Sequence, residues 1–219
     1  MSNDFKIKLY DEAYSHEWQT SKADRIRLKK ALGFVESGGK VLDVGCFTGV
    51  IGKEIESLGN DVYGIEISLP AISKANSKGI KTIRSDMDNK LPVKSNTFDG
   101  VFAGEVIEHL FDVDTFLSEI HRVLRKNGYI VLTTPNLLSF WNRIRAIAGM
   151  PFIDFNKDKQ HIRFFTKSTL KDLLKKHGFE TEKILDTQLV LPIFSRFDIV
   201  FERSIFNLGE NIILKARKI

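Results

Sequence analysis

The sequence predicts an α/β fold in which helices cover both faces of a mostly parallel sheet. Short runs rich in Val, Ile and aromatic residues, which are typical of buried strands, alternate with helix-like segments along the chain. Strands that alternate with helices usually pair in parallel, because each helix carries the chain back to the edge where the last strand began. The expected strands cover residues 40–45, 61–67, 79–86, 98–105, 128–135, 179–187 and 211–219.

Three segments carry a helical pattern together with its end signals. They cover residues 68–79, 113–124 and 166–179. Ser68, Asp112 and Thr166 stand where an N-cap side chain would accept a backbone N–H, and Gly178 is a typical stop. In the second segment the apolar residues recur on one face, so that face is expected to pack on the sheet. We also expect a core-packed helix in the phenylalanine-rich stretch 190–208, with a membrane-surface or dimer helix as the alternative.

Composition indicates one globular domain spanning residues 1–219. The chain is 42% hydrophobic and 28% charged, values that are ordinary for such a domain. Cys46 is the single cysteine, so no intrachain disulfide can form, and we expect a cytoplasmic protein. No signal peptide or membrane-spanning run is evident. We expect residues 1–35 to cap the site, and residues 136–165 and 188–210 to be insertions on the substrate side.

Positive charge is concentrated in residues 136–178. The formal net charge is +5, and this segment holds nine Lys or Arg residues against three acids. One interpretation is a solvated helix face; the other is attraction of an anionic acceptor or surface. Nucleic acid is the less favoured partner, because aromatic residues do not interleave with these charges as they do in nucleic-acid motifs.

The stretch KVLDVGCFTGVIG, residues 40–52, predicts a strand, a glycine-rich turn and a helix. Dinucleotide-binding loops follow the pattern G-x-G-x-x-G, in which the second glycine lets the backbone approach a pyrophosphate. Phe47 breaks that pattern, and the carboxylate of Asp43 would repel phosphate. The loop therefore disfavours NAD or FAD and favours a cationic or hydroxyl-bearing ligand.

Two further acids follow the next two expected strands. Glu66 is placed to accept both hydroxyls of a ribose, or else it caps a helix. Asp86 could accept from an adenine amino group while Met87 covers the ring, although a surface role is an equal alternative. Ligands of open parallel sheets bind beyond the carboxyl ends of the strands, so the three sites together are more persuasive than each alone.

At these residues the chain resembles class I S-adenosylmethionine-dependent methyltransferases, in particular the subgroup that includes ubiquinone-biosynthesis O-methyltransferases. The matching stretches are VLDVGCFTG, VYGIEIS, SDMDNKLPVKSNTFDGVFAGEVIEHL, EIHRVLRKNGYIVLTTPN and HIRFFTKSTLKDLLKKHGF, which cover about residues 40–180. The resemblance implies a Rossmann-like seven-stranded sheet in the order 3-2-1-4-5-7-6 with the last strand antiparallel. It also implies S-adenosylmethionine as cofactor and S-adenosylhomocysteine as product.

The resemblance assigns cofactor contacts residue by residue. The implied contacts are Asp43, Gly45, Cys46 and Gly49 at the methionine part, Glu66 and Ile67 at the ribose, Asp86 and Met87 at the adenine, and Glu105 facing the cofactor. Phe47 departs from the family, in which a glycine is usual at this position. The backbone course of residues 46–48 is therefore the least certain part of the loop.

Two histidines are candidates for the base that would deprotonate an acceptor hydroxyl. His109 follows the fourth expected strand and His161 lies in the inserted segment; a packed, purely structural histidine is the alternative for each. With Glu105 and Glu108 they also resemble the metal-binding set of small-RNA 2′-O-methyltransferases. We expect no bound metal, and a divalent ion is the lesser alternative.

The function that we expect is S-adenosylmethionine-dependent methyl transfer, at an oxygen atom of a small molecule or lipid precursor. An RNA methyltransferase and a non-catalytic cofactor-binding protein are the alternatives. The sequence does not identify the acceptor, and a homodimer stays open.

Overall fold

The computed structural model describes residues 21–152, 160–187, 189–193, 197–201 and 208–219. Seven strands form one sheet in the order β3-β2-β1-β4-β5-β9-β6, which confirms the expected order. The first five pair in parallel, and β9 runs antiparallel to both β5 and β6. Their bounds are β1 Lys40–Val44, β2 Asp61–Glu66, β3 Lys81–Arg84, β4 Phe98–Gly104, β5 Leu124–Pro135, β6 Phe179–Asp186 and β9 Asn211–Lys218.

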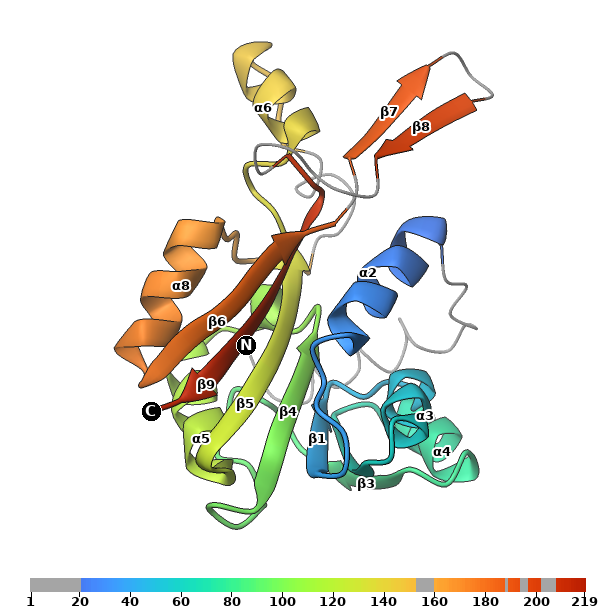
Figure 1. The fold of residues 1–219 in the computed structure, drawn as a ribbon, viewed down its shortest axis with the longest axis vertical. Coiled ribbons are helices and arrows are strands. Elements are labelled where there is room, and N and C mark those ends of the chain that lie inside the picture. Colours follow the sequence, from blue (N-terminus) through green and yellow to red (C-terminus); the bar gives the residue numbers. More distant parts are fainter. Residues whose placement is uncertain (1–20, 153–159, 188, 194–196, 202–207) are drawn as a thin grey trace.

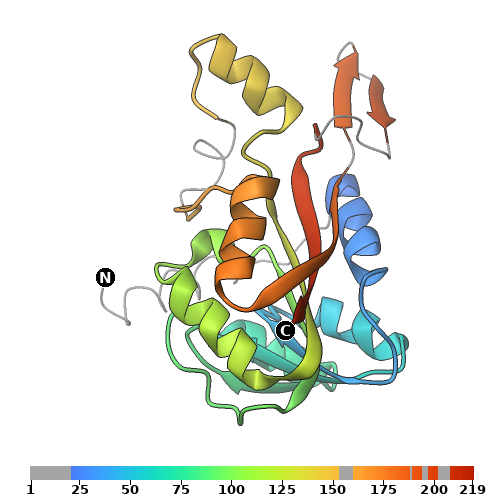
Figure 2. The same ribbon diagram turned by 60° about the vertical axis from the view of Figure 1, so that its left-hand side comes forward.

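Helices cover both faces of the sheet (Figures 1 and 2). They are α2 Lys22–Leu32, α3 Val50–Ser57, α4 Leu69–Ser77, α5 Val113–Val123, α6 Phe140–Ile147 and α8 Lys167–Lys176, with a short 3₁₀ turn, η1, at Ile107–His109. Neighbouring strand residues point to opposite faces. Val41 accordingly packs in the cluster with α2 and α3, whereas Leu42 packs in the larger cluster with α5 and α8.

The three expected helices begin at their expected caps. The side chain of Asp112 accepts from the Thr115 amide at 2.9 Å, and Thr166 and Ser68 cap α8 and α4 in the same way. Strand β5 begins at Leu124, directly after α5, and so it is longer than the expected strand 128–135. No helix of the described residues is long and apolar enough to cross a membrane.

The expectation of a helix in residues 190–208 is wrong. The structure has two short strands there, β7 Leu189–Ile193 and β8 Phe197–Phe201, which pair as an antiparallel hairpin. The runs LVLPI and FDIVF are too short for a helix and are rich in β-branched and aromatic residues, which favour strands. The hairpin and α6 stand beyond the sheet, at the end of the molecule toward which β4 and β5 point (Figure 1).

Candidate active site

The candidate site lies at the edge where the parallel strands end. Strands β1 to β4 pair in parallel, and β4 pairs in parallel with β5, so their carboxyl ends meet at one side of the sheet. The acids predicted from the sequence lie in the last residues of β1 and β2 and in the loops that follow β3 and β4. Ligands of open α/β sheets bind at this side.

The loop after β1 needs its glycines. Gly45 has a φ of 69° and Gly49 a φ of 74°, both in the left-handed region. A Cβ atom at Gly45 would lie 2.7 Å from Cγ2 of Val106, which is too close for any side chain. Phe47 also adopts a positive φ, 48°, although it is not a glycine. The backbone thus keeps a glycine-type course through residue 47.

Three backbone N–H groups fix the carboxylate of Glu66. Its Oε2 accepts from the Phe47 amide at 3.0 Å, and its Oε1 accepts from the amides of Ile67 and Ser68 at 2.7 and 2.9 Å. Charge-assisted bonds of this kind are strong. The loop after β1 and the end of β2 are therefore held together through one buried side chain.

Asp43 is a buried acid with one carboxyl oxygen that accepts no hydrogen bond from the described residues. It is 1% exposed, and its Oδ2 has no hydrogen-bond partner among the described residues. Burial, and to a lesser degree the charge of Glu66, raises the pKa of Asp43 to about 8. A ligand with a cationic or donor group would satisfy this oxygen. Cys46 nearby is also buried, and burial raises the pKa of its thiol, so it is a packing residue rather than a nucleophile.

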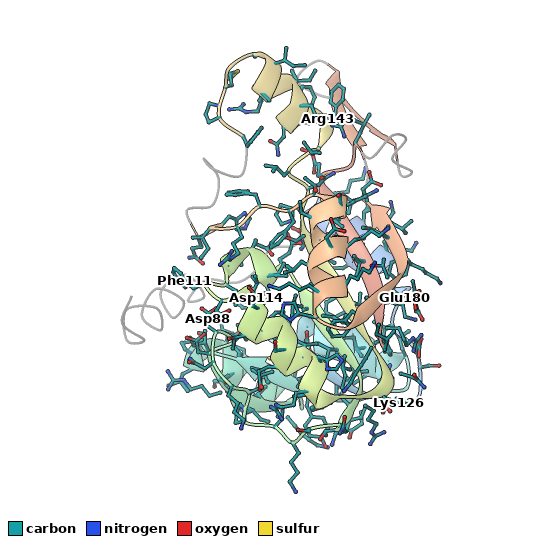
Figure 3. All side chains as sticks on the ribbon, turned by 90° about the vertical axis from the view of Figure 1, so that its left-hand side faces the viewer. Asp88, Phe111, Asp114, Lys126, Arg143 and Glu180 are labelled. Atoms are coloured by element: carbon teal, nitrogen blue, oxygen red, sulfur yellow. The ribbon has the colours of Figure 1, made fainter. Side chains whose placement is uncertain are left out.

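The turn after β3 brings the two adenine-side candidates to the same edge. The Ser85 amide donates to the Glu66 carbonyl at 3.0 Å, which places residue 86 directly beyond β2. Oδ1 of Asp86 accepts from the Asp88 amide at 3.0 Å, and Met87 is buried against the core. Asp88 in turn accepts from the Asp112 amide, and Figure 3 shows Asp88 and Phe111 close together on this side of the molecule.

Glu105 is held by protein groups on several sides. Its Oε2 lies 2.5 Å from Nη1 of Arg27 on α2, and Thr133 and Asn211 donate to its two oxygens. Its φ of 56° is unusual for a glutamate, and the Thr133 carbonyl fixes its amide. The sequence reasoning missed Arg27; no local motif marks it, and only the pairing of α2 with the end of β4 reveals it.

Glu108, His109 and His161 form one cluster. Glu108 is 1% exposed; Thr134 donates to its Oε2, while its Oε1 has no hydrogen-bond partner among the described residues. Burial first, and then the charge of Glu105, raises the pKa of Glu108. The ring of His109 lies 4.7 Å from that of His161. The amides of residues 162 and 163 donate to the Glu108 carbonyl, which joins the two segments.

The orientation of His109 assigns its tautomer. Its Nδ1 lies 3.2 Å from the carbonyl oxygen of Gln160. A carbonyl only accepts, so Nδ1 carries the hydrogen and the lone pair is on Nε2. That nitrogen can take a proton from an acceptor or bind a metal ion.

The structure narrows the possible metal ligands from four to three. Ligand atoms of Glu108, His109 and His161 all lie within 4.8 Å of one another. Glu105, the fourth residue of the expected set, is engaged by Arg27 instead. The three residues have the donor types of a divalent-ion site, and equally those of a base with its polar surroundings.

The fold and these motifs define a methyltransferase, and comparison with known proteins agrees. The sequence model of a family described as "Methyltransferase domain" matches residues 14–184. The chain belongs to this family, and it is an S-adenosylmethionine-dependent methyltransferase.

Its relatives among curated proteins are distant. An uncharacterized protein of Methanocaldococcus jannaschii is 26% identical over 97% of this chain and 87% of its own length. A probable S-adenosylmethionine-dependent methyltransferase of Mycolicibacterium smegmatis is 30% identical, and the human mitochondrial ubiquinone biosynthesis O-methyltransferase 26%. Both alignments cover 68% of this chain, but only 55% and 43% of those proteins.

Solved structures share the fold over nearly the whole chain. A methyltransferase of Archaeoglobus fulgidus covers 99% of this chain with a TM-score of 0.71 and 20% identity; all of that chain is covered. A possible histamine N-methyltransferase of Thermotoga maritima covers 99% with a TM-score of 0.70 and 22% identity, and 96% of that chain is covered. At these identities the likeness concerns the fold alone.

Proposed function

We propose that this methyltransferase acts on a hydroxyl group of a small molecule or lipid precursor, with His109 as the base. The observation that supports this most is the tautomer of His109, which leaves the lone pair on Nε2, in a residue that clusters with His161 and Glu108. A hydroxyl is a poor nucleophile until its proton is removed, so a base at this place serves O-methylation directly.

The residues at the ends of β1, β2 and β3 fit the cofactor. Glu66 would accept the ribose hydroxyls, Asp86 and Met87 would flank the adenine, and Asp43 would meet the cationic methionine end. The unsatisfied Oδ2 of Asp43 and the narrow glycine turn at Gly45 support this assignment. The cofactor supplies an electrophilic methyl group; the protein's part is to orient the acceptor and exclude water.

The proposed base and the names of several relatives indicate which acceptors to test first. Phenols and catechols are the first compounds to test, because their hydroxyl protons are within reach of an imidazole base and several relatives are named ubiquinone biosynthesis O-methyltransferases. Amines form the comparison set, since one structural neighbour is titled a possible histamine N-methyltransferase.

Methyl transfer from labelled S-adenosylmethionine to these compounds tests the proposal. His109→Ala should lower turnover at least about 100-fold, because a general base commonly contributes that much or more. It should still bind S-adenosylhomocysteine as the wild type does. His177→Ala is the matched control, because His177 pairs with Asp114 and is not a member of the cluster. Unchanged turnover in His109→Ala would refute the role of His109 as the base.

A divalent ion on Glu108, His109 and His161 is the second candidate, favoured by the spacing of their ligand atoms. His109 offers one nitrogen, so it cannot be ligand and base at once. We expect turnover to survive a chelator such as EDTA unchanged. If the chelator abolished activity and added Mg²⁺, Mn²⁺ or Zn²⁺ restored it, the cluster would bind a catalytic ion and His109 would not be the base.

A further inference from the structure

Helix α6 is inverted, with its polar side inside and its apolar side outside. Asn142 is 1% exposed, whereas Ile144 and Ile147 are 44% and 86% exposed. At about 100° per residue, the two isoleucines lie on the side of the helix opposite Asn142. Leu138 and Met150, before and after the helix, are also exposed. We call Leu138, Ile144, Ile147 and Met150 the α6 patch.

The helix is firmly attached, so this orientation is a property of the fold. The amide of Asn136 donates to the Glu210 carbonyl at 2.8 Å, and that of Phe140 donates to the Leu208 carbonyl at 3.0 Å. The Leu137 amide donates to the Phe165 carbonyl at 2.9 Å. These bonds anchor the start of α6 to the segments before β9 and before α8. The exposed isoleucines therefore cannot turn inward without breaking them.

The charges of the segment that carries the patch are of one sign. Residues 136–152 contain Arg143 and Arg145 and no acid. Each arginine donates from Nε to a backbone carbonyl, of Leu138 and Pro151 respectively. No ion pair joins either arginine to an acid among the described residues. Figure 3 shows Arg143 at one end of the molecule and Lys126 toward the other.

We propose that the α6 patch docks on an anionic lipid bilayer surface. An interfacial helix of this kind buries its apolar face at the headgroup boundary, while its arginines remain beside the lipid phosphates. A second copy of the chain fits less well. Packing α6 against α6 would bring Arg143 and Arg145 of both copies together, and residues 136–152 contain no acid to offset them.

The position of the patch suits an acceptor that resides in the bilayer. α6 follows β5, and the carboxyl end of β5 borders the candidate site. The β7–β8 hairpin stands beyond the sheet at this same end (Figures 1 and 2), and its ten residues include a single charged one, Asp198. Docking is measured without cofactor or acceptor, so it stands or falls separately from the proposed reaction.

Vesicle co-sedimentation of the full chain tests the proposal. The protein should bind vesicles of phosphatidylcholine with about 30% phosphatidylglycerol and bind pure phosphatidylcholine much more weakly. Replacing both isoleucines, Ile144→Ser with Ile147→Ser, should weaken binding at least about tenfold, because their apolar burial is lost. The control is Leu58→Ser with Leu69→Ser, two leucines outside the patch that are 40% and 50% exposed.

Arg143→Gln with Arg145→Gln should remove most of the dependence on phosphatidylglycerol and leave the weak binding to phosphatidylcholine. Unfolding midpoints of all variants, compared with the wild type, verify that each protein is folded when its vesicle binding is measured. Wild-type protein that sediments with neither vesicle, or isoleucine variants that bind like the control, would overturn the proposal. So would a wild-type dimer in sedimentation velocity that only the isoleucine variants lose, since a second copy would then cover the patch.

Discussion

Asp43 combines burial, a raised pKa and an unsatisfied oxygen in one side chain. The sequence indicated an acid near the end of the first strand, but not that its Oδ2 would lack a hydrogen-bond partner among the described residues. A carboxyl left in this condition costs stability when it ionises, and a cationic ligand removes that cost. The residue thereby links the stability of the protein to pH, and a cationic ligand bound beside it would change that link.

The sign of that link can be tested with Asp43→Asn. Between its ordinary pKa of 3.8 and about 8, the folded chain holds a proton that the unfolded chain releases. The free energy of unfolding that Asp43 governs therefore falls as pH rises through this window. Asn is neutral throughout, so the unfolding midpoint of the variant relative to the wild type should rise between about pH 5 and about pH 9.

Thermal unfolding without ligand measures this difference. Asp61→Asn, at an exposed aspartate of β2, is the control and should show a constant offset. Burial raises the pKa of Glu108 as well, so some pH dependence persists in both proteins, and only the difference between them reports on Asp43. An offset that does not change with pH would contradict the account.

At the scale of elements, the ion pair between Arg27 and Glu105 attaches α2 to the end of β4. Arg27 is buried and also contacts Asp24 within its own helix. Removing one partner of a buried pair is costly because the other charge is left uncompensated. We expect Arg27→Ala to lower the free energy of unfolding by about 3 kcal/mol.

Urea unfolding measures that loss, and Arg125→Ala is the matched control. The pair between Arg125 and Asp99 is exposed, so its removal should cost less than about 1 kcal/mol. Arg27→Ala with Glu105→Gln should recover part of the loss, since no uncompensated charge remains. If Arg27→Ala lowered the free energy of unfolding no more than Arg125→Ala does, the Arg27 pair would not stabilise the docking of α2.

The elements also show where sequence reasoning succeeds and where it fails. Buried strands were predictable because runs such as residues 40–45 are apolar, and caps such as Asp112 and Thr166 act over three residues. The β7–β8 hairpin was missed because two five-residue strands only three residues apart resemble one apolar segment in the sequence. Partners of Glu105 were missed because they lie on α2, β5 and β9, far apart in sequence.

At the scale of the whole molecule, the cofactor should stabilise the fold by mass action. A ligand at 100 times its Kd adds about 2.7 kcal/mol to the free energy of unfolding. For a chain of this length, that corresponds to an increase of about 5–10 °C in the unfolding midpoint. We expect S-adenosylmethionine and S-adenosylhomocysteine to produce it.

NAD is the control ligand in the same thermal-shift measurement. Phe47 breaks the dinucleotide pattern, in which a glycine at this position lets the backbone approach a pyrophosphate. We therefore expect no shift with NAD. A shift with NAD, or none with either sulfur compound, would contradict the assignment of the loop.

The position of β9 has a consequence for the order of assembly during translation. β6 leaves the ribosome before β9, yet among the described strands β6 pairs only with β9. Strands β1 to β5, whose ends carry the candidate site, find their parallel neighbours among themselves and can assemble first. Until β9 arrives, β5 presents an open edge and β6 has no neighbour, a state exposed to aggregation. Proteolysis of ribosome-bound chains should cut near β6 until β9 has emerged.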